Sequence, residues 1–293
     1  MADEKITSIV AKEENGNIPI TFTIPFSFIT KSQSEVVEEY SKEAEIPGFR
    51  KGKAPLEKVK EKIPTNTLVE KALAKIIPEA LSSAINENNL KPAVYPKFEL
   101  VKAKDNEPWG IRAVTCELPK ITLGDDQKIV AGSLKAGSIW TPEKGKAEEK
   151  PKEPSREEKE ERVIKSLLES VKVEVPKLLI NEEVDARLSS LLQRIERLGL
   201  QLEGYLASVG KTPEKLREEY EIQAKNTIAI ELILNEIIRD RKIEIVEKEV
   251  DEAIKAASAD TKLSESLNTP EQRRFIKGVL ARRSALDYLT SLS

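Results

Sequence analysis

The chain has 293 residues, of which 39% are hydrophobic, 34% are charged and only 4% are aromatic, and its formal net charge is −3. This length suffices for two domains or three small ones, and the balance of charge excludes a global field that would draw the chain to nucleic acid. Because the sequence has no histidine, it lacks the commonest general base and the commonest metal ligand of proteins.

The N-terminal residues Met1–Lys5 are charged, and no apolar segment of a secretory signal follows them. No run approaches the ~18 apolar residues of a membrane span, so we expect a cytoplasmic protein without a membrane partner. The single cysteine, Cys116, lies in the alternating stretch Ile111–Leu118. It is expected to be a buried strand residue rather than a nucleophile.

Two strands and a helix are predicted before residue 46. The segments Lys5–Glu13 and Ile18–Pro25 alternate in polarity and flank Asn15-Gly16, which is a strong hairpin signal. The sequence Ser32-Gln33-Ser34-Glu35 has the pattern of a capping box and predicts that a helix begins there.

The next stretch combines helix-breaking residues with an aromatic and three cations. Two glycines and two prolines indicate a fixed, exposed turn between helices. One aromatic ring beside cations can insert into a shallow pocket and contact phosphates or carboxylates around it. The stretch reads Ile46-Pro47-Gly48-Phe49-Arg50-Lys51-Gly52-Lys53-Ala54-Pro55.

Two helices and then two strands are predicted after this loop. Pro55 suits the first helical position, Pro64 ends the first helix, and Pro78 should bend or split the second. Strands at both ends with helices between them predict an α+β domain with antiparallel strand pairs. The expected segments are Leu56–Ile63, Thr67–Asn88, Lys97–Lys104 and Gly110–Leu118.

The middle of the chain shows no clear period. We expect an extended connector over Pro119–Trp140, followed by a charged flexible linker over Pro142–Ser155, which contains no large apolar residue. The remainder is predicted to be helical. Its expected helices are Arg156–Ser170, Pro176–Leu198, Leu202–Val209, Thr212–Arg239, Val246–Ala257 and Thr269–Leu289.

Catalysis finds little support in the sequence. The acidic pairs Asp125-Asp126 and Glu148-Glu149 lie in poorly patterned segments that are not expected to desolvate them. No Gly-x-x-x-x-Gly-Lys-Ser/Thr run is present, so no ATP site is expected, and no cofactor or metal is predicted.

The string Gly48-Phe49-Arg50-Lys51-Gly52-Lys53-x-Pro55 resembles the ribosome-docking signature of trigger factor, the bacterial chaperone at the nascent-chain exit. The resemblance extends to Ile77–Pro92 and, more loosely, to segments of the predicted C-terminal helices. It implies a ribosome-binding domain over residues 1–118, a connector and linker over 119–155, and a helical substrate-binding domain over 156–293.

The resemblance also implies the roles of the loop residues. Phe49 would be the apolar anchor, and Arg50, Lys51 and Lys53 would pair with a carboxylate or phosphates. Gly48 and Gly52 would supply backbone angles, while Pro47 and Pro55 would set the ends of the loop. The implied partners are the large ribosomal subunit, through protein and rRNA at the tunnel exit, and unfolded nascent polypeptides held without ATP.

The sequence departs from the family in one respect. Trigger factors usually carry an FKBP-like prolyl isomerase domain of ~100 residues between these parts, and residues 119–155 leave no room for it. We therefore expect no isomerase activity. Two alternatives stay open: an RNA-binding or ribosome-associated scaffold without chaperone activity, and either a monomer or the weak homodimer that free members of the family often form.

Overall fold

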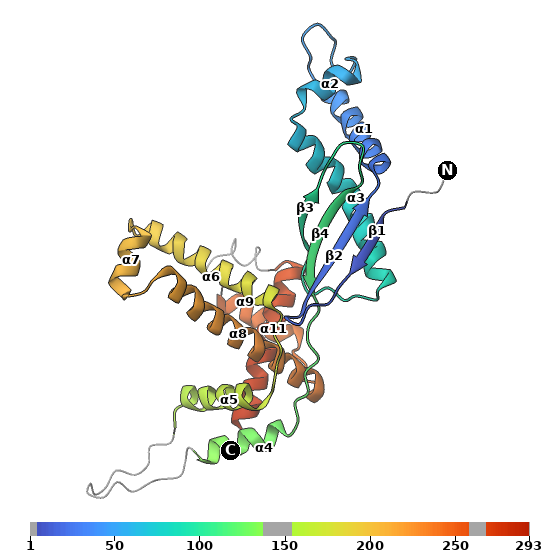
Figure 1. Ribbon diagram of the computed structural model, residues 1–293. Helices are drawn as coiled ribbons and strands as arrows, with labels where there is room; N and C mark the ends of the chain where they lie inside the picture. The colour runs from blue at the N-terminus through green and yellow to red at the C-terminus, as the bar shows by residue number, and fades with distance from the viewer. Residues whose placement is uncertain (1–4, 137–153, 258–267, 293) are drawn as a thin grey trace, which may run out of the picture. The chain divides into compact units, whose positions relative to one another are not determined.

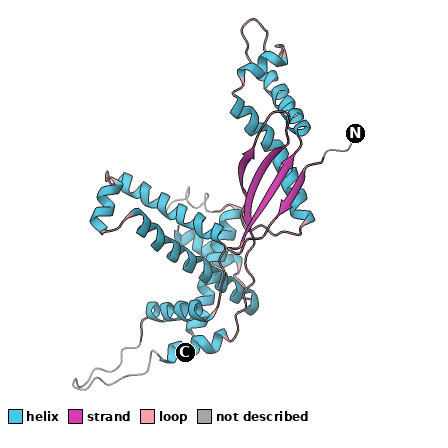
Figure 2. Cartoon of the chain, viewed as in Figure 1, coloured by secondary structure: helices cyan, strands magenta, loops and turns pink. Residues whose placement is uncertain are grey.

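The computed structural model describes residues 5–136, 154–257 and 268–292 (Figure 1). The chain divides into two compact units. The N-terminal unit comprises Met1–Leu118 together with Pro176–Leu178, and the helical unit comprises Pro119–Val175 and Leu179–Ser293. The predicted fold class is confirmed, because an antiparallel sheet with helices is followed by a mostly α-helical region (Figure 2).

The N-terminal unit is a four-stranded antiparallel sheet with helices on one face. The strand order is β1-β2-β4-β3, so β2 pairs with the hairpin strand β1 on one side and with β4 on the other. Three helices lie between the first and second strand pairs. The elements are β1 (Thr7–Val10), β2 (Asn17–Ile24), α1 (Phe26–Glu43), α2 (Leu56–Lys62), α3 (Thr65–Glu87), β3 (Lys97–Lys102) and β4 (Trp109–Cys116).

Alternation along the two central strands builds the core of this unit. Ile20 of β2 lies opposite Ala113 of β4, and both are fully buried. Every second residue of these strands points toward α1 and α3, whereas Thr21 and Arg112 between them face solvent. Cys116 is buried in β4, as predicted.

Helix α1 begins earlier than the sequence predicts. Its N-cap is Pro25, and Ser32 lies inside the helix, so the predicted capping box at Ser32–Glu35 is wrong. The hydroxyl of buried Ser32 donates a 2.9 Å hydrogen bond to the carbonyl oxygen of Ala72 in α3. Apolar spacing from Ile29 onward therefore outweighs the local capping signal. Helix α3 also continues through Pro78 as one helix, without the split considered from the sequence.

The segment Pro176–Leu178 belongs to the N-terminal unit, although the residues on either side of it belong to the helical unit. The N–H of Lys177 donates to the carbonyl oxygen of Asn15 at 3.0 Å, and the N–H of Leu178 donates to Asn17 Oδ1 at 3.0 Å. Gly16 between these asparagines has a φ of 79°, and a Cβ there would lie 3.2 Å from Pro176. The hairpin turn therefore requires glycine for both its backbone conformation and its packing.

Within the described residues, the regular elements of the helical unit are α-helices. Thr212 caps α8 by accepting from the Lys215 N–H, with Pro213 in the first turn, as the sequence predicts. Ser155 caps α5 in a capping box with Glu158. The helices are α4 (Asp126–Ala136), α5 (Arg156–Ser170), α6 (Lys177–Arg197), α7 (Leu202–Val209), α8 (Pro213–Arg241), α9 (Glu247–Ala257) and α11 (Pro270–Thr290).

The predicted extended connector over Pro119–Trp140 is wrong for residues 126–136, which form α4. Val130 and Leu134 of this helix are buried in one cluster with Val163 and Leu167 of α5 and with Ile233 of α8. This tertiary burial stabilises a helix that contains Gly132 and Ser133 and that has little helical periodicity of its own. Residues 142–153 of the predicted linker and residues 137–140 of the predicted connector lie outside the described residues.

Across the described ranges, no helix is both long and apolar enough to cross a membrane.

Candidate functional site

The loop between α1 and α2 consists of two consecutive tight turns. In the first, the N–H of Phe49 donates to the carbonyl oxygen of Ile46 at 3.0 Å, with Gly48 at φ 87°. In the second, the N–H of Lys53 donates to the carbonyl oxygen of Arg50 at 2.9 Å, with Gly52 at φ 74°. Glycine with positive φ at the third position is typical of type II turns. Each of the two turns is therefore closed by one backbone hydrogen bond.

The base of the loop is anchored in a small core. Ile46 is buried in a cluster with Val36 and Val37 of α1 and Val59 of α2, and Ala54 packs against the same cluster. A Cβ on Gly52 would lie 3.3 Å from the carbonyl oxygen of Lys42, at the end of α1. The loop therefore contacts the helix end closely at its base, while Figure 1 shows it projecting from the end of the N-terminal unit.

The side chains at the apex point to solvent. Phe49 is 46% exposed, and Arg50, Lys51 and Lys53 are exposed as well. Within the described part of the chain, no salt bridge engages these three cations. The structure thus brings the predicted site residues Gly48, Phe49, Arg50, Lys51, Gly52, Lys53 and Pro55 together on one short loop, with Pro55 as the N-cap of α2.

A groove beside this loop is not evident from the sequence. It has a volume of about 140 Å³ and lies between α1 and α2; we call it the α1–α2 groove. Leu56, directly after Pro55, is 44% exposed and lines the groove, although helical spacing groups it with the buried Val59. The residues that line it are Thr30, Gln33, Ser34, Val37, Leu56, Glu57 and Lys60.

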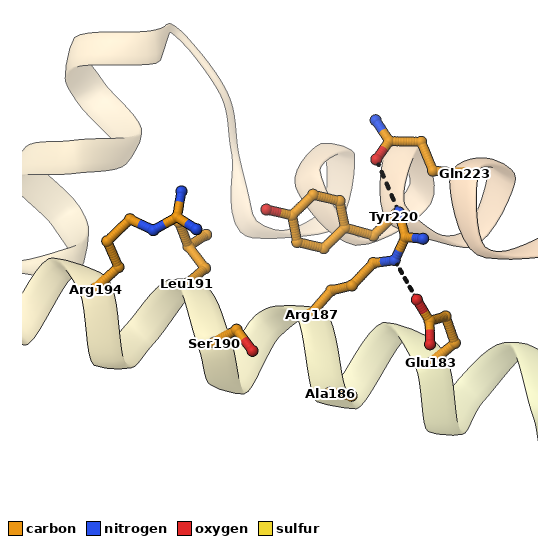
Figure 3. Close-up of a pocket in the computed structure, with 8 residues that line it drawn as sticks. All are labelled: Glu183, Ala186, Arg187, Ser190, Leu191, Arg194, Tyr220 and Gln223. Carbon is orange, nitrogen blue, oxygen red and sulfur yellow. Dashed lines mark hydrogen bonds and ion pairs between the residues drawn. The ribbon is translucent and has the colours of Figure 1, made fainter. Parts of the chain in front are cut away.

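The helical unit has a polar concavity of about 370 Å³ between α6 and α8 (Figure 3). Arg187 crosses it and donates to Glu183 Oε1 at 2.7 Å, Gln223 Oε1 at 3.2 Å and Thr227 Oγ1 at 2.9 Å. Figure 3 shows the Tyr220 ring and the Arg194 side chain at the same concavity, on facing helices. No salt bridge among the described residues engages Arg194.

A second concavity of this unit, about 590 Å³, lies among α5, α8 and α11. Its lining mixes both signs of charge with apolar side chains, including Val279, which is 41% exposed. Phe275, one helical turn before Val279, is 65% exposed. Exposed apolar side chains rimmed by charges are typical of interaction surfaces. The sequence shows these residues only as members of helical apolar faces.

The prediction that Asp125 and Asp126 both lie in a segment that does not desolvate them is wrong for Asp126. Asp126 is buried, not left in unstructured chain, and its Oδ1 accepts from Arg241 Nη2 at 3.0 Å. Asp125 instead forms an exposed 3.1 Å pair with Lys128, so the two carboxylates do not share a site. The other pair, Glu148-Glu149, lies outside the described residues. Within residues 5–136, 154–257 and 268–292, no group of three acidic or cysteine side chains is placed to hold a metal ion.

Charge pairs join α9 to α11. Arg273 donates to Glu247 and to Asp251, each at 2.7 Å. The hydrogen bond from Arg273, followed by that from Lys277, lowers the pKa of Glu247, and the same contact with Glu247 raises the pKa of Arg273. Beside these exposed pairs, the apolar residues Val250 and Ile254 of α9 are buried in one cluster with Ala281 of α11.

Comparison with protein families matches both units. The model described as "Bacterial trigger factor protein (TF)" matches residues 7–135, and the one described as "Bacterial trigger factor protein (TF) C-terminus" matches residues 144–291. A solved structure described as "Promiscuous Substrate Recognition in Folding and Assembly Activities of the Trigger Factor Chaperone" covers 98% of this chain and 99% of its own, with a TM-score of 0.60. At 14% identity, this likeness shows the fold alone.

Curated relatives match shorter stretches. A trigger factor of Thermoanaerobacter sp. (strain X514) is 29% identical over 151 residues, which are 50% of this chain and 35% of the relative. A trigger factor of Limosilactobacillus reuteri (strain DSM 20016) is 31% identical over 106 residues, which are 36% of this chain and 24% of the relative. The chain therefore spans between 24% and 35% of the length of these two relatives.

Proposed function

This chain belongs to the bacterial trigger factor family, and we propose that it is an ATP-independent chaperone that docks at the ribosomal tunnel exit and holds nascent polypeptides during folding and export. In this proposal residues 1–118 bind the ribosome, 119–155 connect, and 156–293 bind the client. One observation carries it: the α1–α2 loop presents exposed Phe49 beside three cations that have no salt-bridge partner among the described residues.

The geometry of the loop supports docking as a preformed element. Both turns are closed by backbone hydrogen bonds, and Ile46 anchors the base. Binding therefore orders little backbone, which lowers the entropic cost of association. Phe49 is the proposed apolar anchor, and Arg50 contributes the bidentate contact to a carboxylate or phosphate that a lysine cannot make.

The helical unit offers dispersed contacts suited to holding a client weakly. The end of α6 and the residues after it expose Leu192 (47%), Leu198 (68%) and Leu200 (53%). They provide separate small apolar contacts rather than one deep site, and Leu192 lies on α6, the helix that also supplies part of the polar lining of the concavity between α6 and α8. Such contacts bind an unfolded segment with modest affinity and release it when the segment folds.

We further propose that the chain is not an enzyme and works in the cytoplasm. Between Leu118 and Ser155, α4 already accounts for residues 126–136, and it packs with α5 and α8. The remaining residues are far fewer than the ~100 that a separate isomerase domain would need. A prolyl isomerisation assay on a proline-containing peptide should therefore show the uncatalysed rate, and a clear acceleration would overturn this part of the proposal.

An RNA-binding scaffold without chaperone activity is the second candidate, because α2 adds Lys58, Lys60 and Lys62 to the loop cations. Lys58, however, is paired with Glu61 at 2.9 Å, and Phe49 is the only aromatic side chain in the loop that could stack on a base. Steep salt dependence of binding to free RNA would favour this candidate.

Co-sedimentation with bacterial ribosomes tests the docking proposal. The triple variant Phe49→Ala, Arg50→Ala, Lys51→Ala should stay in solution while the parent chain pellets with the large subunit. A matched control is the variant Lys5→Ala, Lys31→Ala, Tyr95→Ala, which also removes one exposed aromatic and two exposed cations from the N-terminal unit. If the loop variant pellets like the parent while folded by circular dichroism, docking through the loop is wrong.

A further inference from the structure

The α1–α2 groove has the composition of a pocket for one apolar side chain. Its floor includes Val37, which is 4% exposed, and one wall is Leu56. Its volume of about 140 Å³ compares with the ~150 Å³ of a cavity that holds benzene. The groove is therefore large enough for one aliphatic or aromatic side chain.

Polar groups around the groove are of two kinds. The hydroxyl of Thr30 donates to the carbonyl oxygen of Phe26, and that of Ser34 to the carbonyl oxygen of Thr30, each at 2.9 Å. These hydroxyls already have partners within α1, so an apolar occupant leaves neither unsatisfied. By contrast, no hydrogen bond or ion pair within the described chain engages the side chains of Gln33, Glu57 or Lys60.

This arrangement favours a protein occupant over a nucleic acid. Glu57 and Lys60 carry opposite charges, so together they offer no net attraction to phosphates. An apolar floor with free amide, carboxylate and ammonium groups at the rim instead fits a buried side chain whose flanking backbone is hydrogen-bonded. The adjoining loop adds three exposed cations, Arg50, Lys51 and Lys53, which attract an acidic group of a protein as well as a phosphate.

We propose that the α1–α2 groove is a second contact for the protein that the loop docks on, and that it takes one aliphatic or aromatic side chain of a large-subunit ribosomal protein. This inference rests on the proposed function. The two contacts are continuous in the chain, since Pro55 closes the loop and Leu56 lines the groove. The partner surface that fits both has an acidic group next to a protruding apolar residue.

Filling the groove tests this inference without touching the loop. Ser34 is exposed and lines the groove, so Ser34→Trp places an indole in it, while Leu56→Ala removes one wall. The matched control is Ser83→Trp, because Ser83 is also an exposed helical serine of the N-terminal unit and does not line the groove. Ser34→Trp should raise the Kd for purified ribosomes about tenfold, and Leu56→Ala should raise it severalfold. Ser83→Trp should leave the Kd within about twofold of the parent.

Phe49→Ala, measured in parallel, separates the two proposals. If Phe49→Ala weakens binding and both groove variants bind like the parent, the groove inference is wrong and docking through the loop stands. If Phe49→Ala has no effect, docking through the loop fails, and the groove inference fails with it. Binding of reduced, carboxymethylated lactalbumin without ribosomes should be the same for all variants. A loss confined to this assay would make the groove a client site and overturn the inference.

A photo-crosslinking residue at position 34 identifies the class of partner directly. On ribosomes, p-benzoylphenylalanine at this position should form an adduct with one large-subunit protein, whereas the same residue at position 83 should not. An adduct with rRNA alone would overturn the inference. Thermal unfolding of each variant, compared with the parent, confirms that the differences come from binding rather than from loss of fold.

Discussion

Asp126 and Arg241 form a 3.0 Å ion pair although they lie 115 positions apart in the sequence, and the aspartate is almost completely buried. The pair joins the first turn of α4 to the last turn of α8. Arg241 also pairs with Asp240 at 2.6 Å, and its side chain is 31% exposed. Removing Arg241 therefore leaves a buried carboxylate without its cation, whereas removing Asp126 leaves Arg241 with Asp240 and with solvent.

We expect Arg241→Ala to destabilise the helical unit by about 3 kcal/mol, because it leaves the Asp126 carboxylate buried without a counter-charge. Asp126→Ala should cost about half as much, since Arg241 keeps Asp240 and contact with water. Urea unfolding followed by far-UV circular dichroism measures both, and the double variant should recover part of the loss. Equal costs for the two single variants would contradict this account.

The buried hydrogen bond between Ser32 and Ala72 gives a second prediction. Ser32→Ala removes a bond between α1 and α3 and should cost about 1 kcal/mol. Ser34→Ala is the control, because Ser34 is exposed and bonds only within its own helix, so its removal should be nearly neutral. Fluorescence of Trp109, which is buried in β4, follows unfolding of this unit when both variants carry Trp140→Phe, which removes the other tryptophan of the chain. The account fails if both alanine variants are equally stable.

The two loop glycines should respond differently to substitution. Gly48 and Gly52 both have positive φ, but a Cβ on Gly48 meets nothing within 4 Å, whereas one on Gly52 meets the Lys42 carbonyl at 3.3 Å. Gly48→Asn should therefore be nearly neutral in stability and in ribosome binding, since asparagine tolerates this conformation. Gly52→Asn should destabilise the unit by about 1 kcal/mol or more and weaken ribosome binding. The reverse order in stability or in ribosome pelleting would count against the turn geometry described here.

Glu117 couples the stability of the N-terminal unit to pH. The backbone N–H of Lys91 donates to its Oε1 at 2.7 Å, and this bond, followed by the contact with Lys12, lowers the pKa of Glu117. Because the pKa of Glu117 is lower in the folded state than the usual value of 4.5, its ionised carboxylate stabilises the fold at pH values above 4.5. This stabilisation is lost as the pH falls from 4.5 through the lowered pKa of the folded state. Glu117→Gln should therefore reduce stability at pH 7, and this effect should shrink as the pH falls below 4.5.

Unfolding of the parent and of Glu117→Gln across this pH range, followed by Trp109 fluorescence with Trp140→Phe in both chains, tests the point. A stability difference that is the same at both ends of the range would show that the charge of Glu117 is not involved. Glu99→Gln serves as the comparison, because Glu99 is an exposed carboxylate on the edge strand β3 of the same sheet.

Local signals predicted the elements whose ends are set by their own residues. Thr212 and Pro213 mark the start of α8, Asn15 and Gly16 mark the hairpin, and the glycines of the loop mark its turns. Each depends on backbone conformation or on a cap within a few residues, which a sequence pattern contains directly. The exposure of Phe49 follows for the same reason, because the helix-breaking residues around it leave no element to bury it.

The features that the sequence did not show depend on distant partners. Helix α4 exists because Val130 and Leu134 meet α5 and α8, and Asp126 is buried only once Arg241 reaches it. The α1–α2 groove requires Val37 and Leu56 from two helices whose packing no local pattern specifies. The sequence pattern predicted Ser32 as a helix cap because the partner of its hydroxyl, the carbonyl oxygen of Ala72 in α3, lies 40 residues further along the chain.

The strand pairing of β2 determines when this chain can fold during its own synthesis. Asn17 lies opposite Cys116, so the two central strands of the sheet come from positions about 100 residues apart. Until β4 leaves the ribosome, Ile20 and Phe22 have no partner strand beyond the short β1, and their hydrophobic side chains stay open to other contacts. A protein proposed to shield emerging chains therefore passes through an interval in which its own first strands need shielding.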